Sequence, residues 1–468
     1  MPTDMPFQHS SDFRVRRFLN WFPLGLTYAF LYMARYNLTV AKNALGDLMT
    51  KEDFGVIFAV GTFTYAFAFL INGPLTDKLG GRRTILIAAI GVAAMNILMG
   101  LFTQAFLGSP GGVLFENRTV LFSLLYAVNM YFQSFGAVSI VKVNASWFHV
   151  RERGVFGGIF GILISLGLYF AFDWGTGIVN ATIANPQNLN FIQAGIRAIF
   201  GIDGAAGDET WWVFWIPAAI LLVFFVIDYF MVWDRPSQTG HKDFNTGDAS
   251  SGDTSDEFHL GEILRKILTN KIILTIAFIE FCSGVMRNGV MHWFPIYVKE
   301  LLKNNAITAA PFVSENWGLI LMFAGVLGGM TAGWVSDHIF GSRRGPVAAL
   351  LYGLLTVGAI VMSFTYTNVE VLGWVVAFMS LFVIGVHGML SGTSTMDFGG
   401  RKAAGTAVGL IDGFVYLGTG VQSLALGFLT TSNWGYWAPF LIPFGILGTY
   451  LATRIWFAFP DSKRGGGH

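Results

Sequence analysis

The chain has 468 residues but only one cysteine, Cys282, and only 12% of its residues are charged. A single cysteine excludes an internal disulfide and a multi-cysteine metal site. Soluble domains carry about 25% charged residues, so this low share argues against a water-soluble fold. The net charge of +1 gives no support for nucleic-acid binding. We find no Walker loop, no zinc-binding His/Glu spacing and no nucleophile elbow, so we expect no enzyme activity, cofactor or metal.

What the chain has instead is long apolar runs. Hydrophobic residues make up 54% of the sequence, and their runs recur at about 20 residues, the length of a helix that crosses a bilayer. We therefore expect an all-α membrane protein with 12 transmembrane helices. The predicted spans are 18–40, 54–76, 84–102, 120–143, 154–176, 211–233, 272–298, 317–335, 346–365, 372–396, 405–430 and 437–457.

A polar stretch divides these spans into two groups of six. It contains the run GDASSGDTSD at 247–256, a composition typical of a linker. We expect an N-terminal half at 1–233, a cytoplasmic linker at 234–270 and a C-terminal half at 271–468. Basic residues gather on one side of the spans, so the positive-inside rule places both termini in the cytoplasm and the loop 179–209, with room for a short helix, outside. The polar, then basic N-terminus leads into a full span, so we expect no cleavable signal peptide.

Two arginines lie inside predicted spans, Arg35 in the run FLYMARYN and Arg287 near the middle of the seventh span. If the first helix starts near Pro23, Arg35 lies about 18 Å along it, deep in the membrane. A charge at that depth costs at least about 2.5–3.5 kcal/mol and persists where it faces a wet cavity and a partner. Guanidinium cannot deprotonate, and its fork of donors suits a phosphate. We predict that Arg35 and Arg287 hold an anionic substrate.

The alternative is that each arginine pairs with a carboxylate of the protein. Glu280 is the obvious candidate for Arg287, because it lies seven residues earlier on the same helix face. The distance along the axis is about 10 Å, which is too long for a direct bond without bending.

Two loops repeat one pattern, GPLTDKLGGRR at 73–83 and GWVSDHIFGSRR at 333–344. Their glycines let helix ends approach, the aspartates cap a neighbouring helix or pair with the arginines, and the arginines meet lipid headgroups. An ordinary short basic loop is the alternative. The pattern resembles the signature of the major facilitator superfamily, which implies two pseudo-symmetric halves with the substrate site between them. The predicted gating residues are Asp77, Arg82, Arg83, Asp337, Arg343 and Arg344.

Further motifs resemble those of one family within this superfamily. YMAR at 32–35, RERG at 151–154, RNGV at 287–290, WFPIYVKE at 293–300, RKAAGTA at 401–407 and YLG at 416–418 are similar to those of the organophosphate:phosphate antiporter family. That family includes glycerol-3-phosphate and hexose-6-phosphate carriers. The resemblance implies that Arg35 and Arg287 bind the phosphoryl group. It also matches Gln133 and Lys142 to polar family positions, of which Lys142, near the end of its span, is expected to be structural.

The chain departs from the family pattern in ways that make its site less positive. Apolar or aromatic residues replace two lysines, a histidine and an acid of well-known members: Tyr36, Phe69, Ile164 and Met322. Conversely, Glu280 and Asp412 are acids inside spans. We hypothesise that they receive a cationic part of the substrate or take up protons. The alternative is a carboxylate bonded to a neighbouring helix.

Other side chains are candidates for the cavity wall. Five aromatic residues offer OH and NH donors, although packing is the commoner role of such aromatics: Tyr32, Tyr36, Tyr65, Trp293 and Tyr297. His387 either senses pH or bonds a backbone carbonyl. Asp397, beside Arg401 and Lys402, is expected in a closing network.

The combined expectation is a monomeric secondary transporter of the inner (plasma) membrane. It would exchange an organic phosphate for inorganic phosphate by alternating access, and its partners would be the bilayer and a small anion. Two rivals stay open. One is a transporter-like sensor of sugar phosphates, and the other is a proton-coupled symporter of an organic anion.

Overall fold

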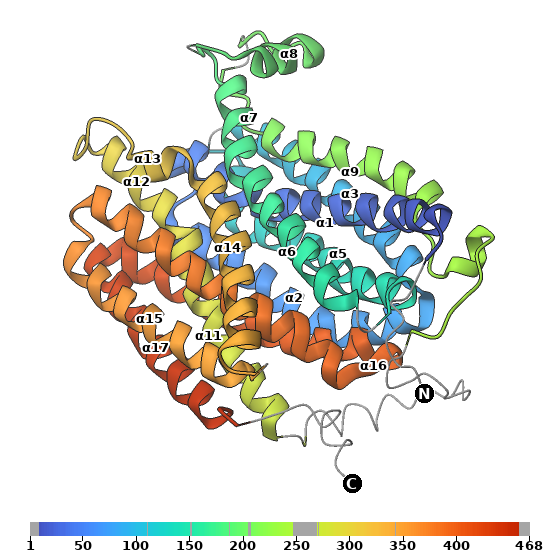
Figure 1. Cartoon of the computed structure of the whole chain (residues 1–468). Coiled ribbons are helices and arrows are strands. Elements are labelled where there is room, and N and C mark those ends of the chain that lie inside the picture. The colour runs from blue at the N-terminus through green and yellow to red at the C-terminus, as the bar shows by residue number, and fades with distance from the viewer. Residues whose placement is uncertain are drawn as a thin grey trace, which may run out of the picture.

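The computed structural model describes residues 9–109, 111–149, 152–186, 188–204, 207–246, 269, 271–341 and 343–457, without the side chains of 153–160 and 391–408. This part is almost entirely helical and holds no strand (Figure 1). Its long helices before residue 234 are α1 (Ser11–Leu45), α2 (Lys51–Leu79), α3 (Gly81–Leu107), α5 (Arg118–Trp147), α6 (Arg153–Tyr169) and α9 (Trp212–Met231). Those after residue 270 are α11 (Lys271–Met291), α12 (Trp293–Lys303), α14 (Trp317–His338), α15 (Arg344–Thr365), α16 (Val369–Ser432) and α17 (Trp437–Arg454).

Ten stretches within the described residues are long and apolar enough to cross a membrane, and each coincides with a predicted span. The other two predicted spans are α1 and α17, whose apolar runs hold more polar residues. In α1 these include Asn20, Arg35 and Asn37, all buried. The all-α membrane fold predicted from the sequence is confirmed.

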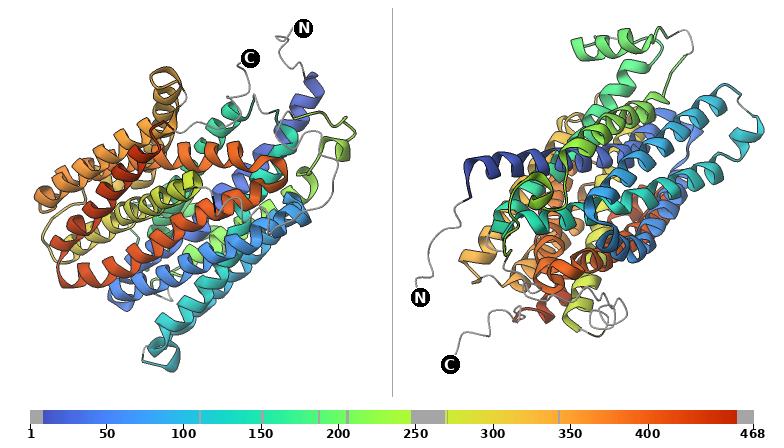
Figure 2. Two further views of the ribbon diagram at one scale, coloured as in Figure 1. Left: turned by 90° about the horizontal axis from the view of Figure 1, so that it is seen from below. Right: turned by 90° about the vertical axis from the view of Figure 1, so that its right-hand side faces the viewer.

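Helices far apart in the sequence lie side by side. α2 packs along α16, and α6 packs along α14 (Figures 1 and 2). The contact is close because small residues meet: a Cβ on Gly55 would lie 2.7 Å from the carbonyl oxygen of Ser423. Elements from before residue 234 therefore share an extended interface with elements from after residue 270.

The first helix starts earlier than expected. α1 begins at Ser11, where the side chain of Ser10 accepts a hydrogen bond from the Phe13 amide, and Pro23 lies inside the helix. The helix therefore does not start near Pro23, because the Ser10 side chain caps it at Ser11. Thr27 Oγ1 donates to the Pro23 carbonyl 3.1 Å away, so a side chain adds a bond in the turn that follows the proline.

The tenth and eleventh predicted spans belong to one helix, α16, which has 64 residues. A straight helix of that length would measure about 96 Å. Its two ends nevertheless lie close together, because a Cβ on Gly435 would be 3.4 Å from the hydroxyl of Tyr366. α16 therefore folds back between its two apolar stretches, Val369–Leu390 and Gly409–Ser432. The expected closing network of Asp397, Arg401 and Lys402 falls on side chains outside the described residues.

Two predicted spans are interrupted. The fifth passes from α6 through a π-helical turn, Phe170–Trp174, into α7 (Gly175–Thr182). The seventh breaks at His292, between α11 and α12. Such irregular turns inside membrane helices are typical of functional sites. Both breaks hold polar side chains that join elements far apart in sequence.

Short helices fill two of the connections. α4 (Val113–Glu116) lies between α3 and α5, and α13 (Phe312–Glu315) lies between α12 and α14. The loop 179–209 carries the short helix expected there, α8 (Phe191–Phe200), and in Figure 1 it projects beyond the bundle. Of the predicted linker, only residues 234–246 and 269 are described.

Glycine is required where α11 crosses α16. A Cβ on Gly284 would lie 1.9 Å from the carbonyl oxygen of Val415, and a Cβ on Gly418 would lie 2.1 Å from that of Phe281. Gly284→Ala is expected to destabilise the protein by about 1–3 kcal/mol, because overpacking pushes the helices apart. Thermal unfolding of the purified protein measures this. Gly353→Ala in α15, where a Cβ would meet open space, is the matched control, and equal melting temperatures for the two variants would contradict the close crossing.

Candidate functional site

Arg35 is fully buried on α1 and held by neutral partners. Its Nη2 donates to the Tyr65 hydroxyl at 3.0 Å and to Gln133 Oε1 at 3.1 Å, and its Nη1 donates to the Tyr416 hydroxyl. Gln133 is fixed in turn, because its Nε2 donates to the Leu31 carbonyl at 2.9 Å. These acceptors orient the guanidinium but do not neutralise its charge.

Arg287 has a different environment from Arg35. It lies on α11 with an exposed fraction of 6%, and it makes no hydrogen bond or ion pair with any residue that the structure describes. Its Nε is a buried donor without an acceptor. A buried polar group left unpaired costs about 1–3 kcal/mol, and more if it is charged. Arg287 is therefore a cation with donors to offer.

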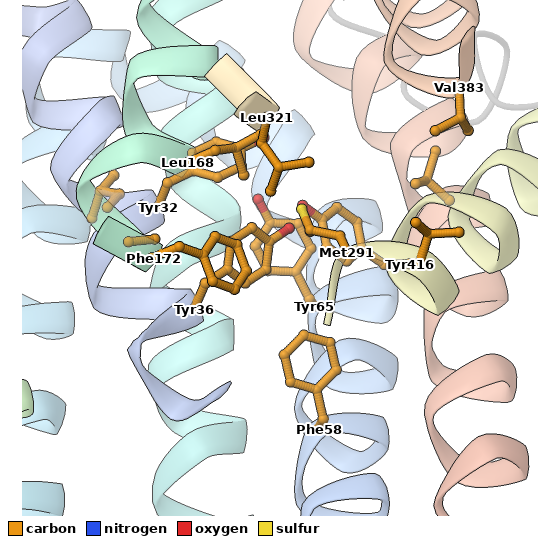
Figure 3. Close-up of a cluster of buried hydrophobic side chains, with 14 of the residues drawn as sticks. Tyr32, Tyr36, Phe58, Tyr65, Leu168, Phe172, Met291, Leu321, Val383 and Tyr416 are labelled. Carbon is orange, nitrogen blue, oxygen red and sulfur yellow. The ribbon is translucent and has the colours of Figure 1, made fainter. Parts of the chain in front are cut away.

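One cluster of tyrosines faces both arginines. The hydroxyls of Tyr32, Tyr36 and Tyr416 interact electrostatically with Arg35 and with Arg287. Figure 3 shows the rings of Tyr36, Tyr65 and Tyr416 converging, and those of Tyr65 and Tyr416 are 4.1 Å apart. The Arg35 guanidinium also lies 4.7 Å from the centre of the Tyr32 ring, a cation–π contact. The structure thus brings together Arg35, Arg287, Tyr32, Tyr36, Tyr65 and Gln133.

Glu280 does not bond Arg287. Its Oε2 is 2.7 Å from Nδ1 of His387, and its Oε1 has no hydrogen-bond partner among the described residues. The expectation that His387 bonds a backbone carbonyl is therefore wrong, because α16 brings the ring against the carboxylate of α11. Asp412 is half-buried and interacts electrostatically with His387 and Tyr416. Glu280 thus lies near Arg287 without forming an ion pair with it.

Trp293, the first residue of α12, packs among aromatic rings. Its ring packs edge-on at 5.9 Å from Phe54 and 6.2 Å from Trp434, and its Nε1 has no acceptor. Tyr297, a further candidate for the wall, donates its hydroxyl to the Tyr366 carbonyl at 2.9 Å. The aromatic residues of α12 therefore serve packing first.

The first of the repeated loops contacts other helices of the bundle. Asp77 forms an ion pair with Lys142 of α5 at 2.9 Å, which gives Lys142 the structural role expected of it. Arg82 was expected to meet lipid headgroups, but its Nη2 donates to the Tyr229 carbonyl at 2.6 Å and its guanidinium lies 3.8 Å from the centre of the Trp233 ring.

The arginines of the second loop lie within that loop and at the start of the next helix. Arg83 is exposed, and Asp337 lies in the last turns of α14. Arg343 Nε donates to the Phe340 carbonyl at 3.1 Å within its own loop, and Arg344 begins α15. The first arginine of each pair, Arg82 and Arg343, thus makes a different hydrogen bond in the two loops.

Sequence reasoning also missed polar contacts across the interface. Thr39 Oγ1 is 2.8 Å from His292 Nδ1. Asp173, in the π-helical turn, accepts hydrogen bonds from the amides of Gly318 at 2.7 Å and Leu319 at 2.9 Å at the start of α14. A lone acid in the apolar fifth span was a visible signal for Asp173.

These contacts lie toward the end of the bundle where α1 ends and α2 begins, here called the Lys299 end. Two ion pairs also cross the interface there, one from Lys51 to Glu300 at 2.7 Å and one from Lys303 to Asp47. In this structure the interface is therefore fastened at the Lys299 end.

The fold and the paired arginines define a class, that of membrane transporters with two halves around a central site. The comparisons agree: residues 24–423 match the family model of the Major Facilitator Superfamily, and the chain belongs to that family. A bacterial homolog of the human lysosomal transporter Spinster, solved facing inward, has a TM-score of 0.63 at 14% identity and covers 96% of this chain and 98% of its own. That likeness shows the fold alone.

Curated relatives narrow the comparison. The glycerol-3-phosphate transporter of Bacillus subtilis is 26% identical over 442 residues, covering 92% of this chain and 90% of its own. The probable hexose phosphate transport protein of Chlamydia trachomatis is 25% identical over 482 residues, covering 97% and 93%. The membrane sensor protein UhpC of Escherichia coli is 24% identical over 440 residues, covering 90% and 88%. The resemblance to organophosphate carriers predicted from the sequence is confirmed.

Proposed function

We propose that this chain is a secondary transporter that exchanges an organic phosphate for inorganic phosphate by alternating access. The observation that carries the proposal is the state of the two arginines. Arg35 is bonded only to neutral groups, Arg287 is unbonded among the described residues, and both face the same tyrosines. Two cations in one low-dielectric site repel each other, and an oxyanion that accepts from both removes that repulsion.

The two arginines would act unequally. Tyr65, Gln133 and Tyr416 hold the Arg35 guanidinium in one orientation, so it forms a fixed half of the binding site. Arg287 is free to turn toward the anion. A phosphate bound to Arg35 would attract Arg287 and draw the two halves together, whereas the empty carrier keeps its repulsion and does not reorient. Obligatory exchange follows from this difference.

The halves would be residues 1–233 and 271–468, joined by the linker 234–270. Both termini and the linker would lie in the cytoplasm of a cell with the chain in its plasma membrane. The Lys299 end would then face outside, because α1 starts on the basic side of the bilayer and ends at that face. Fastening at the Lys299 end would correspond to a carrier that is closed to the outside.

Counterflow in vesicles tests the proposal. Purified protein reconstituted in lipid vesicles loaded with phosphate is expected to take up labelled phosphate at least about tenfold faster than in empty vesicles, since only the loaded carrier reorients. Protein-free vesicles control for leakage. Equal uptake into loaded and empty vesicles would contradict exchange.

A second candidate rests on one relative that is a membrane sensor protein. A sensor would bind a sugar phosphate without moving it. The same vesicles separate the two, because a sensor would show saturable binding of the sugar phosphate and no accumulation inside.

A further inference from the structure

A cavity of about 630 Å³ lies at the Lys299 end of the bundle. Its wall comes from both sides of the interface. Lys42 lies in the last turn of α1, Asp47 follows α1 and Lys51 begins α2, while Lys299 and Lys303 belong to α12. The volume is in the range of small-molecule sites, roughly 300–1,000 Å³. The cavity, here called the vestibule, is therefore large enough for a ligand rather than a single water.

The vestibule carries uncompensated positive charge. Its wall holds four lysines and two acids, and both acids are already paired, Glu300 with Lys51 and Asp47 with Lys303. Lys299 is exposed and has no ion-pair partner among the described residues. Lys42 is nearly buried, and its Nζ donates only to the Gly46 carbonyl, at 3.3 Å. Two ammonium groups are thus left to attract an anion.

The vestibule lies in line with the arginine site. Lys42 follows Arg35 by seven residues on one helix. Because seven residues are close to two full turns, Lys42 occupies the same face of α1, about 10 Å nearer the Lys299 end. The contact between Thr39 and His292 lies between these two levels. The contact of Thr39 with His292 would therefore separate a ligand in the vestibule from Arg35.

We propose that the vestibule is a waiting site for soluble phosphate and organic phosphate anions on the outer face of the carrier. Lys42 and Lys299 hold the anion by charge, and the lysines around them raise its local concentration. When the contact of Thr39 with His292 opens, the anion passes to Arg35. This inference rests on the proposed transport function and on the orientation given above.

The test separates the two faces of the membrane. In oriented vesicles, Lys42→Gln and Lys299→Gln are each expected to raise the KM for phosphate supplied outside about threefold, and together about tenfold, at low salt. The KM for phosphate supplied inside should not change. Lys271→Gln is the matched control, because Lys271 is exposed and flanks the other end of the seventh predicted span, which Lys299 follows. Equal increases on both faces would show a structural role and overturn the proposal.

A pH profile adds a second readout. Burial, together with the charges of Lys51 and Lys303, lowers the pKa of Lys42 to about 8, against the opposing effect of Glu300 and Asp47. Lys42 therefore loses its charge as pH rises through about 8, and the external KM of the wild type should rise over that interval. Lys42→Gln should show no such rise, and comparison at each pH cancels the titration of phosphate itself. Parallel profiles would overturn the role of Lys42.

Two further arms identify the ligand. Calorimetric titration of the Arg287→Gln variant with inorganic phosphate should show binding. That binding should disappear in the triple variant that also carries Lys42→Gln and Lys299→Gln. If the wild type exchanges no phosphate but Arg287→Gln still binds it, the result supports the vestibule site and contradicts the transport function. If Arg287→Gln binds no phosphate, the result contradicts the vestibule site. Adding phosphatidylglycerol to phosphatidylcholine vesicles should leave the external KM unchanged at high salt, whereas an increase that needs both lysines would assign the site to a lipid headgroup instead.

Discussion

Phosphate exchange by Arg287→Gln is expected to fall at least about a hundredfold, although the protein still folds. The neutral amide cannot offer a charged fork to the anion, and loss of one partner of a buried, hydrogen-bonded charge pair costs about 2–5 kcal/mol. Folding should survive because Arg287 makes no bond with any described residue. Counterflow of labelled phosphate in loaded vesicles measures the loss.

Replacement by glutamine should change the melting temperature differently at the two arginines. Arg35→Gln leaves buried acceptors on Tyr65, Gln133 and Tyr416 without their donor, so its melting temperature should fall. Arg287→Gln removes a repelling charge and should melt at or above the wild-type temperature in the absence of phosphate. Phosphate at a hundred times its dissociation constant should stabilise the wild type by about 2.7 kcal/mol and Arg287→Gln much less.

Arg454→Gln, at the exposed end of α17, controls for the loss of an arginine as such. Wild-type exchange by Arg287→Gln would show that the anion does not need the second guanidinium. Equal destabilisation of the Arg35 and Arg287 variants would show that Arg287 is bonded within the protein.

The sequence predicts the helices well because their signal is local. A run of apolar residues about as long as the bilayer is thick has to form a helix, since the backbone finds no other hydrogen-bond partner in lipid. The burial of Arg35 and Arg287 inside helices was also predictable, because each arginine lies in a long apolar run. The sequence predicted a loop where α16 folds back, because the polar residues there suit a loop as well as a continued helix.

Partners across helices were not predictable in the same way. Helical periodicity tells which residues share a face, but it does not tell which helix that face meets. The bond between Glu280 and His387 joins residues of α11 and α16, and the bond between Thr39 and His292 joins α1 to the break before α12. Tyr416 shows the same limit: it entered the sequence reasoning only as part of a motif, yet it bonds Arg35.

The second large effect is expected at Glu280. This acid is fully buried, with one oxygen on His387 and the other unbonded, and it lies seven residues before Arg287 on α11. An unbonded carboxylate oxygen beside an anion site is suited to accept a cationic group of the substrate or a proton. Glu280→Gln is therefore expected to lower uptake of an amine-bearing phosphate about tenfold to a hundredfold, while exchange of phosphate for phosphate continues.

The choice between an amine and a proton is made by two measurements on the same vesicles. If Glu280 receives an amine, Glu280→Gln and His387→Gln lose the preference for amine-bearing phosphates over simple ones, with an unchanged pH profile. If it takes up a proton, the pH dependence of uptake flattens and the preference stays, which would favour proton-coupled symport. Glu370→Gln, at the exposed start of the helix that carries His387, is the matched control. Variants of Glu280 and Asp412 that kept both the wild-type preference and the wild-type pH profile would leave the two acids a purely structural role, because neither a charge on the substrate nor a proton would then depend on them.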